Sequence, residues 1–254
     1  MTQKIIAVVN QKGGVGKTTT AINVAAQLAS DKQSVLLVDL DPQGNATSGL
    51  GVAKEGAQQT TYDLLRGEVP LADVVAETNV AQLFVVPANA NLAGSEVELV
   101  SRMQREFALQ QALQSAAYDY IIIDCPPSLG LLTINALTAA NNVLIPVQAE
   151  YYALEGLSQL LNTVQAVKQA TNPHLELLGI VLTMFDKRNS LSEQVETEVR
   201  NYFGDKLFKT VVPRNVRLAE APSFGRTIYE HDKWSKGARA YKALSKEIHT
   251  RLEK

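Results

Sequence analysis

A glycine-rich loop between a predicted strand and a predicted helix is the feature that most constrains this chain. Ile5–Val9 is a short apolar run, and Lys17–Ser30 carries alanine, isoleucine and leucine at helical spacing. The loop, residues 10–20, has the sequence Asn-Gln-Lys-Gly-Gly-Val-Gly-Lys-Thr-Thr-Thr. A strand, a glycine-rich turn, Gly-Lys-Thr and a helix in this order predict a phosphate-binding loop.

The residue types of the loop explain how it would hold a phosphate chain. Glycines let the backbone curl with its N–H groups turned inward, and the following helix adds its positive dipole end. Lys17 would reach the β- and γ-phosphates, and the Thr18 hydroxyl would bind Mg²⁺. A glycine turn that merely starts a tightly packed helix is the alternative, but the complete order of elements favours nucleotide binding. The residues expected to contact the nucleotide are Lys12, Gly13, Gly14, Val15, Gly16, Lys17, Thr18 and Thr19.

Short apolar runs alternate with helical segments along the rest of the chain. This alternation predicts a mostly parallel, doubly wound sheet of about seven or eight strands, flanked by helices, in a single α/β domain over residues 1–254. Residues 44–56 are rich in Gly, Ser, Thr and Asn and predict a loop. The other predicted strands are Val35–Asp39, Leu83–Val86, Tyr120–Asp124, Val143–Val147, Leu178–Met184 and Leu207–Val212.

Composition excludes several classes of protein. A chain with 46% hydrophobic and 20% charged residues is not disordered. Cys125 is the one cysteine, so neither an intrachain disulfide nor a CxxC metal or cluster site can form. The sequence shows no signal-peptide pattern and no apolar run as long as a membrane span, and we expect a cytoplasmic protein.

Charge is distributed unevenly along the chain. Residues 1–186 contain 9 Lys and Arg against 17 Asp and Glu, whereas residues 187–254 contain 15 against 9. A basic C-terminal quarter on an acidic body indicates a face that meets a polyanion. Basic side chains that merely solvate the last helices would give the same counts, so charge alone does not decide between the two.

Three carboxylates lie at the ends of predicted strands. Ligands of an open α/β sheet bind outside the carboxyl ends of the strands, which places these groups near the phosphate loop. Asp124 ends an apolar strand as a Walker B aspartate does, and would hold a water ligand of Mg²⁺. Asp39 and Asp41 could instead cap the next helix, but a phosphate loop in the same sheet favours a role at the nucleotide.

The phosphate loop departs from the usual G-x-x-x-x-G-K-[ST] pattern, because Gln11 replaces the first glycine and a second lysine, Lys12, follows it. This loop resembles the deviant Walker A loop of the ParA/MinD ATPases. Further segments over nearly the whole chain resemble the Soj-type chromosomal ParA proteins. They are residues 38–45 (VDLDPQGN), 123–127 (IDCPP), 148–152 (QAEYY) and 213–222 (PRNVRLAEAP).

The resemblance implies roles for five residues at the nucleotide. Lys12 would cross a dimer interface to the phosphates bound by the other subunit, so that ATP is sandwiched between two chains. Asp39 would hold Mg²⁺ through water, and Asp41 would orient the water that attacks the γ-phosphate. Catalysis would then depend on Lys12, Lys17 and Asp41. Pro213 and Asn215 match positions that hold the adenine in relatives.

The resemblance also implies partners. Arg188 and Arg217 match the DNA-contacting arginines of the family, and Lys233 and Lys236 add charge nearby. Binding through phosphate contacts would be independent of DNA sequence and steeply dependent on salt. The expected protein is a nucleoid-associated partition ATPase that forms a homodimer with ATP, and a ParB-type centromere-binding protein stimulates its weak hydrolysis. Trp234 between the two lysines is expected to be a packing anchor rather than a base-stacking platform.

Two other function classes share parts of this sequence pattern. A MinD-like membrane switch needs a C-terminal amphipathic helix with a bulky apolar face, whereas the tail offers only Leu244, Ile248 and Leu252, a stripe that suits docking onto the domain. An amidating or carboxylating enzyme on a related P-loop fold, such as a cobyrinate synthase, would need a substrate pocket, often with an extra domain. No helix-turn-helix extension precedes the phosphate loop, so we expect no operator-specific repression.

Overall fold

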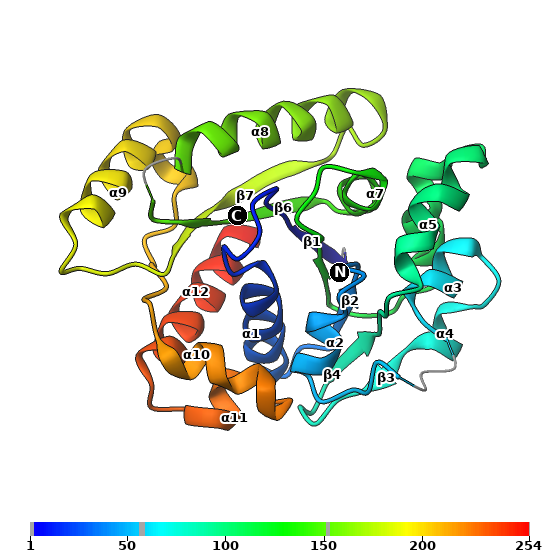
Figure 1. Ribbon diagram of the computed structural model, residues 1–254, viewed down its shortest axis with the longest axis horizontal. Coiled ribbons are helices and arrows are strands. Elements are labelled where there is room, and N and C mark those ends of the chain that lie inside the picture. The colour runs from blue at the N-terminus through cyan, green and yellow to red at the C-terminus, as the bar shows by residue number, and fades with distance from the viewer. Residues whose placement is uncertain (1–2, 56–58, 151–152, 254) are drawn as a thin grey trace.

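Seven strands form one sheet in the computed structural model, which describes residues 3–55, 59–150 and 153–253 (Figure 1). The strand order is β3-β4-β2-β5-β1-β6-β7, and all neighbours are parallel except β3 and β4. The strands are β1 (Lys4–Val8), β2 (Val35–Asp39), β3 (Ala76–Glu77), β4 (Leu83–Val86), β5 (Tyr120–Asp124), β6 (Asn142–Gln148) and β7 (Glu176–Thr183). The prediction of a mostly parallel, doubly wound sheet is confirmed.

The helices lie on both faces of this sheet (Figure 1). The α-helices are α1 (Lys17–Ser30), α2 (Asn45–Gly49), α3 (Thr61–Arg66), α4 (Leu71–Val74), α5 (Leu92–Glu98), α6 (Ala108–Ala112), α7 (Leu131–Ala139), α8 (Ala153–Ala170), α9 (Ser190–Phe203), α10 (Val216–Glu220), α11 (Ile228–Asp232) and α12 (Lys236–Leu252). Four short 3-10 helices, η1 to η4, cover Leu99–Ser101, Arg105–Phe107, Gly204–Lys206 and Ala221–Phe224. The helix predicted over Lys17–Ser30 is confirmed.

Alternate residues of the central strands enter two separate hydrophobic cores. Ile6 and Val8 pack in the core that includes α1, α2, α10, α11 and α12, whereas Ala7 and Val9 pack in the core that includes α3 to α9. All four side chains are fully buried or nearly so. A strand that is apolar on both faces must be covered on both faces, and this explains the continuous apolar runs of the sequence.

The predicted strand Leu207–Val212 is wrong. Its ends run beside β7, with Phe208 N–H donating to Ile180 O at 2.8 Å and Val212 N–H donating to Leu182 O at 2.8 Å, but only isolated bridges form. Between them, the N–H groups of residues 209 and 210 donate to the carboxylate of Glu247 on α12. A side chain from a helix thus takes the donors that a strand ladder would need.

The loop predicted over residues 44–56 contains a helix, α2. Gly44 precedes it in the left-handed region, with φ 60°, and the buried Asp39 carboxylate accepts the N–H of Thr47 within its first turn at 2.8 Å. A negative charge near a helix N-terminus satisfies free N–H groups and complements the dipole. The capping role that the sequence left as an alternative is therefore real for Asp39.

The C-terminal helix α12 packs beside α1, as Figure 1 shows with the red and blue ribbons. Leu244 and Ile248 are fully buried in the core between the two helices and the sheet, and Leu252 packs against the same core. The apolar stripe of the tail docks onto the domain, as predicted. In the described part of the chain, none of the helices is long and apolar enough to cross a membrane.

Candidate active site

The carboxyl edge of the three central strands gathers the predicted site. β5 lies between β1 and β2, with Asp124 paired in register both to Val8 and to Asp39. The phosphate loop leaves β1 at this same edge, and Asp41 follows β2 by two residues. Parallel pairing therefore brings together carboxylates that are far apart in sequence, as predicted from the strand ends.

Buried hydrogen bonds fix the phosphate loop to the neighbouring strands. Asn10 donates from Nδ2 to Pro146 O at 2.8 Å, and its Oδ1 accepts the N–H of Lys12 at 3.0 Å. Thr183, the last residue of β7, donates from Oγ1 to Val15 O at 2.7 Å. Gly14 and Gly16 have φ of 74° and 88°, a conformation that L side chains rarely adopt.

The anchoring residues Asn10 and Thr183 were missed in the sequence. Thr183 carries a recognisable signal, because it is a polar residue that closes an apolar strand, as Asp39 and Asp124 close theirs. It is only 2% exposed. Both residues fix the loop through contacts with backbone groups.

The two lysines of the loop occupy different environments. Lys17 is buried at the start of α1 and donates from Nζ to Lys12 O at 3.0 Å, within its own loop. Burial lowers the pKa of Lys17, against the opposing charges of nearby carboxylates such as Asp124. Lys12 is 54% exposed and its ammonium pairs with the carboxylate of Glu150, which follows β6. Only Lys17 faces the interior of the loop.

Asp39 and Asp124 are both fully buried yet differ in their partners. Asp39 accepts from Thr47 N at 2.8 Å, from Thr47 Oγ1 at 2.7 Å and from Asp41 N at 3.2 Å. Burial raises the pKa of Asp39 to about 6, although these hydrogen bonds oppose the shift. Neither carboxylate oxygen of Asp124 accepts a hydrogen bond of full geometry among the described residues, although the nearby Thr18 hydroxyl favours its charged form and opposes the rise of its pKa.

Burial, reinforced by the charge of Asp39, raises the pKa of Asp124 well above its usual range. An orphaned carboxylate in the interior is costly unless a cation or donor meets it. Oxygen donors are what Mg²⁺ prefers, and the Thr18 hydroxyl lies at the start of α1 at the same edge. The residues present therefore fit a magnesium ion at this position.

The site holds no ready-made cage for a metal. No group of three His, Cys, Asp or Glu that could hold a metal occurs within residues 3–55, 59–150 and 153–253. An ion bound chiefly by phosphate, water and one hydroxyl needs no such group. Burial raises the pKa of the adjacent Cys125 well above its usual range, so this thiol is a core residue and not a nucleophile.

Asp41 and the proposed adenine residues lie on loops around this edge. Asp41 is 7% exposed and its Oδ1 accepts the N–H of Gln43 at 2.9 Å, a turn that fixes the carboxylate after β2. Pro213 forms an isolated bridge with Phe185, just beyond the end of β7. Asn215 caps α10, its side chain accepting from Leu218 N at 3.3 Å. Its carboxamide oxygen is thereby engaged, and a base contact would fall to its NH₂ group.

The basic residues predicted to meet DNA are exposed but not all free. Arg188 is 89% exposed in its side chain and binds Asp186 through two bonds, Nε–Oδ1 at 3.0 Å and Nη2–Oδ2 at 2.8 Å. Arg217 donates to Glu220 at 2.9 Å and lies 3.8 Å from Asp232. The two arginines could be predicted from the sequence, whereas the carboxylates that bind them could not.

Lys236 and Arg188 line one pocket of about 710 Å³ between the start of α12 and the segments that follow β7. Lys187, Arg214 and Arg239 line it as well. Lys233 lies outside this set, with its ammonium 5.3 Å from the centre of the Trp234 ring. Trp234 is 77% exposed, so the expectation that it anchors packing is wrong.

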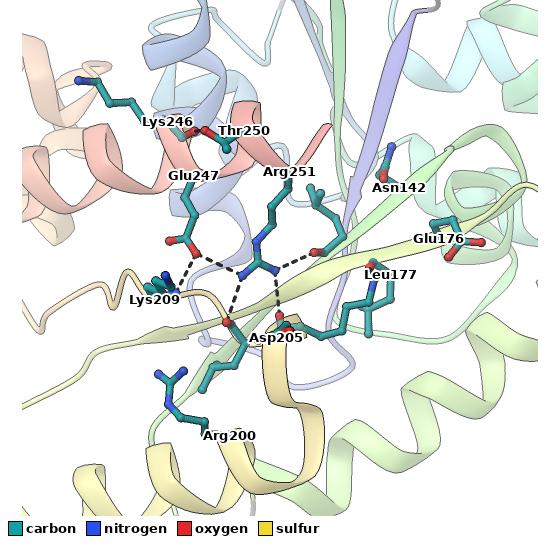
Figure 2. Close-up of a pocket in the computed structure, with 13 residues that line it drawn as sticks. Asn142, Glu176, Leu177, Arg200, Asp205, Lys209, Lys246, Glu247, Thr250 and Arg251 are labelled. Carbon is teal, nitrogen blue, oxygen red and sulfur yellow. Dashed lines mark hydrogen bonds and ion pairs between the residues drawn. The ribbon is translucent and has the colours of Figure 1, made fainter. Parts of the chain in front are cut away.

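A pocket of about 810 Å³ lies at the opposite end of the sheet, where β6 and β7 begin (Figure 2). Arg251, Glu247 and Lys206 in its lining bind one another or nearby backbone groups. The Arg251 guanidinium covers the Phe208 ring at 3.8 Å and donates to Leu178 O and Leu207 O at 3.0 and 3.1 Å. Glu247 accepts from Arg251 at 3.2 Å. These contacts hold α12 against β7, at the end of the sheet away from the phosphate loop.

Comparison with known proteins extends these observations. The family model described as an AAA domain (AAA_31) matches residues 3–177. The chain is 58% identical to the sporulation initiation inhibitor protein Soj of Bacillus subtilis over 247 residues, 96% of this chain and 98% of that protein. It is 57% identical to the chromosome partitioning protein ParA of Myxococcus xanthus over 247 residues, 96% of this chain and 87% of that protein.

A solved structure gives the same architecture. The chain matches cobyrinic acid a,c-diamide synthase from Mycobacterium smegmatis, with bound ADP and magnesium, at a TM-score of 0.87 and 37% identity. The match covers 99% of this chain and 96% of that one. The phosphate loop, the strand-end carboxylates and the helical layers described above thus belong to a fold that accommodates a nucleotide with its metal in that protein.

Proposed function

Because the chain belongs to the ParA/Soj family of chromosome-partitioning ATPases, we propose that it is a nucleotide-gated DNA-partition switch. ATP with Mg²⁺ would join two copies into a sandwich dimer that binds duplex DNA without reading its sequence. A ParB-type centromere-binding protein would stimulate hydrolysis and so release the dimer from DNA. The protein would be cytoplasmic and associated with the nucleoid.

The division of labour between the two lysines carries this proposal. Lys17 is buried within its own loop, where it can neutralise the phosphates bound there. Lys12 is half exposed and pairs with Glu150 at the surface, so it has no role toward its own loop beyond its backbone. Its exposure at the surface supports contact with a nucleotide held by a second copy.

The strand-end residues would share the chemistry. Thr18 and waters held by Asp124 and Asp39 would bind Mg²⁺, which neutralises charge on the phosphates. Asp41 would orient the attacking water. Positioning this water is its main contribution, because alignment of the reactants accounts for much of phosphoryl-transfer catalysis. Pro213 and Asn215 would border the adenine.

DNA binding would use the basic surface of the C-terminal quarter. Arg188, Arg217, Lys233 and Lys236 are exposed there, and none of them is needed to hold the core together. Contacts of this kind neutralise phosphates and release counterions, so affinity should fall steeply with salt. The burial of Leu244 and Ile248 removes the apolar face that a MinD-like membrane role would need.

Partition is favoured over amidation by sequence identity. The partition proteins Soj and ParA are 58% and 57% identical to the chain, whereas the diamide synthase is 37% identical. The likeness to the synthase is strongest in the fold, which many activities share.

The proposal is tested by measuring the molecular mass in solution of three proteins: the unaltered chain, Lys12→Ala and Lys17→Ala. The unaltered chain should double in mass with a non-hydrolysable ATP analogue and Mg²⁺. Lys12→Ala should still bind nucleotide but remain a monomer, and Lys17→Ala should lose tight nucleotide binding. Normal dimerisation of Lys12→Ala would contradict the sandwich, and sequence-selective or salt-independent DNA binding by the dimer would contradict the phosphate-contact mode.

A further inference from the structure

Both arginines proposed to meet DNA are already engaged by carboxylates of the same chain. Asp186 holds Arg188 through two hydrogen bonds, the paired geometry with which a guanidinium also binds a phosphate. Glu220 holds Arg217 at 2.9 Å. A DNA phosphate can therefore take the N–H groups that are already paired on either arginine only by replacing a carboxylate.

Asp186 is surrounded by several basic side chains. The pocket it shares with Arg188 is lined by Lys187, Arg214, Lys236 and Arg239, and Asp186 is the one acidic residue in that lining. The Arg188 guanidinium, with a further contribution from Arg214, lowers the pKa of Asp186 to about 2. The carboxylate is thus ionised at every pH at which the protein would work.

Glu220 has a similar position at the second arginine. It accepts from Arg217 and lies 3.5 Å from Nε2 of His231, and Asp232 approaches Arg217 from the other side at 3.8 Å. The pKa of Glu220 is lowered by Arg217 first and by His231 second. Two carboxylates therefore share the guanidinium that is proposed to bind DNA.

We propose that Asp186 and Glu220 are internal competitors for the DNA backbone, which hold Arg188 and Arg217 in the free protein and set how weakly it binds DNA. The inference rests on the proposed DNA-binding function and adds a means of regulating it. The ion pairs are exposed, and exposed pairs are weak enough to be exchanged for phosphates. Weak binding by a single chain would make retention on DNA depend on the two sets of contacts in a dimer.

The test measures affinity for an unrelated duplex with the ATP analogue and Mg²⁺ present. Asp186→Asn keeps the oxygen that accepts the backbone N–H of Arg188 at 3.0 Å but removes the charge. We expect it to bind DNA about two- to fivefold more tightly, which corresponds to the free energy that an exposed ion pair usually contributes. Glu220→Gln should act in the same direction through Arg217.

A matched control separates pairing from net charge. Asp73→Asn makes the same change of charge on α4, beside β3 at the opposite edge of the sheet from β7. At physiological salt, charges further apart than about 8 Å are largely screened, so this variant should bind DNA as the unaltered chain does. Matching thermal unfolding of all variants establishes that they are folded.

A double-variant cycle decides whether the gain passes through the arginine. In an Arg188→Ala background, Asp186→Asn should give no further gain. If Asp186→Asn binds no more tightly than Asp73→Asn, or gains as much without Arg188 as with it, the competition is overturned while DNA binding itself stands. If the unaltered chain retains no DNA, the proposed function fails and this inference fails with it.

Discussion

Replacing Asp124 with asparagine should stabilise the nucleotide-free protein while abolishing its hydrolysis of ATP. Asp124 is fully buried, neither of its oxygens accepts a hydrogen bond of full geometry among the described residues, and it is paired in register with the equally buried Asp39. Functional sites commonly lower the stability of a protein when their ligand is absent. Asparagine keeps the shape and removes the charge.

The magnitude follows from strand geometry. The backbones of neighbouring strands are about 4.8 Å apart. Two carboxylate charges held at the same separation repel each other by about 3.5 kcal/mol at an effective dielectric constant of 20. Asparagine removes this repulsion but leaves a buried amide without partners, which offsets part of the gain. A net gain of about 2 kcal/mol would raise the melting temperature by about 4–8 °C in a chain of this size.

Thermal unfolding without nucleotide, between pH 5 and pH 8.5, provides the assay. A carboxyl whose pKa is raised on folding takes up a proton as pH falls, so the unaltered protein loses its penalty at low pH. The advantage of Asp124→Asn should therefore be largest at pH 8.5 and shrink toward pH 5. Asp73→Asn, an exposed counterpart, should change little at any pH. A melting temperature for Asp124→Asn at or below that of the unaltered chain at pH 8.5 would refute the reasoning.

Two further changes test the positioning of water and of the loop. Asp41→Ala should still bind ATP and dimerise but accumulate on DNA. Its phosphate release should fall at least about 100-fold, because alignment of the attacking water is lost. A monomeric variant, or one with the original rate of phosphate release, would contradict the role given to Asp41. Thr183→Val keeps the side-chain volume but leaves Val15 O without its donor at 2.7 Å. The loss should lower the free energy of unfolding by about 1–3 kcal/mol and weaken nucleotide binding. Denaturant unfolding and nucleotide titration measure the two effects, and unchanged values in both would show that this hydrogen bond does not shape the loop.

Much of the architecture could be predicted because local pattern and tertiary environment agree. The strand at Val35–Asp39 and the helix at Lys17–Ser30 match their predicted bounds, since a continuous apolar run and a helical stripe each have one stable packing here. The carboxyl-edge cluster followed from the rule that parallel strands present their ends together. These features depend on periodicity, which a sequence records directly.

Features created by side chains from distant elements could not be predicted in this way. Glu247 on α12 draws two N–H groups away from a segment that otherwise looks like a strand, and Thr183 anchors a loop 168 residues away. Asp186 sits two residues from Arg188, yet only side-chain geometry reveals that they pair. Such contacts depend on where the fold places a side chain, which no local pattern specifies.

Asp39 and Asp124 show how the fold distinguishes two carboxylates that look alike in sequence, and Asp39→Asn tests the distinction. Either substitution removes the same repulsion, so their difference in stability isolates the hydrogen bonds. Asp39 accepts three, two of them from Thr47, and an amide would turn its NH₂ toward at least one of these donors. Leaving one buried donor unsatisfied costs about 1–3 kcal/mol. We therefore expect Asp39→Asn to be at least about 1 kcal/mol less stable than Asp124→Asn in nucleotide-free protein at pH 8.5. Equal unfolding free energies would mean that the bonds to Asp39 contribute nothing specific. The expected order would show that Asp39 stabilises the fold through these bonds, in addition to the water that it is proposed to hold for Mg²⁺.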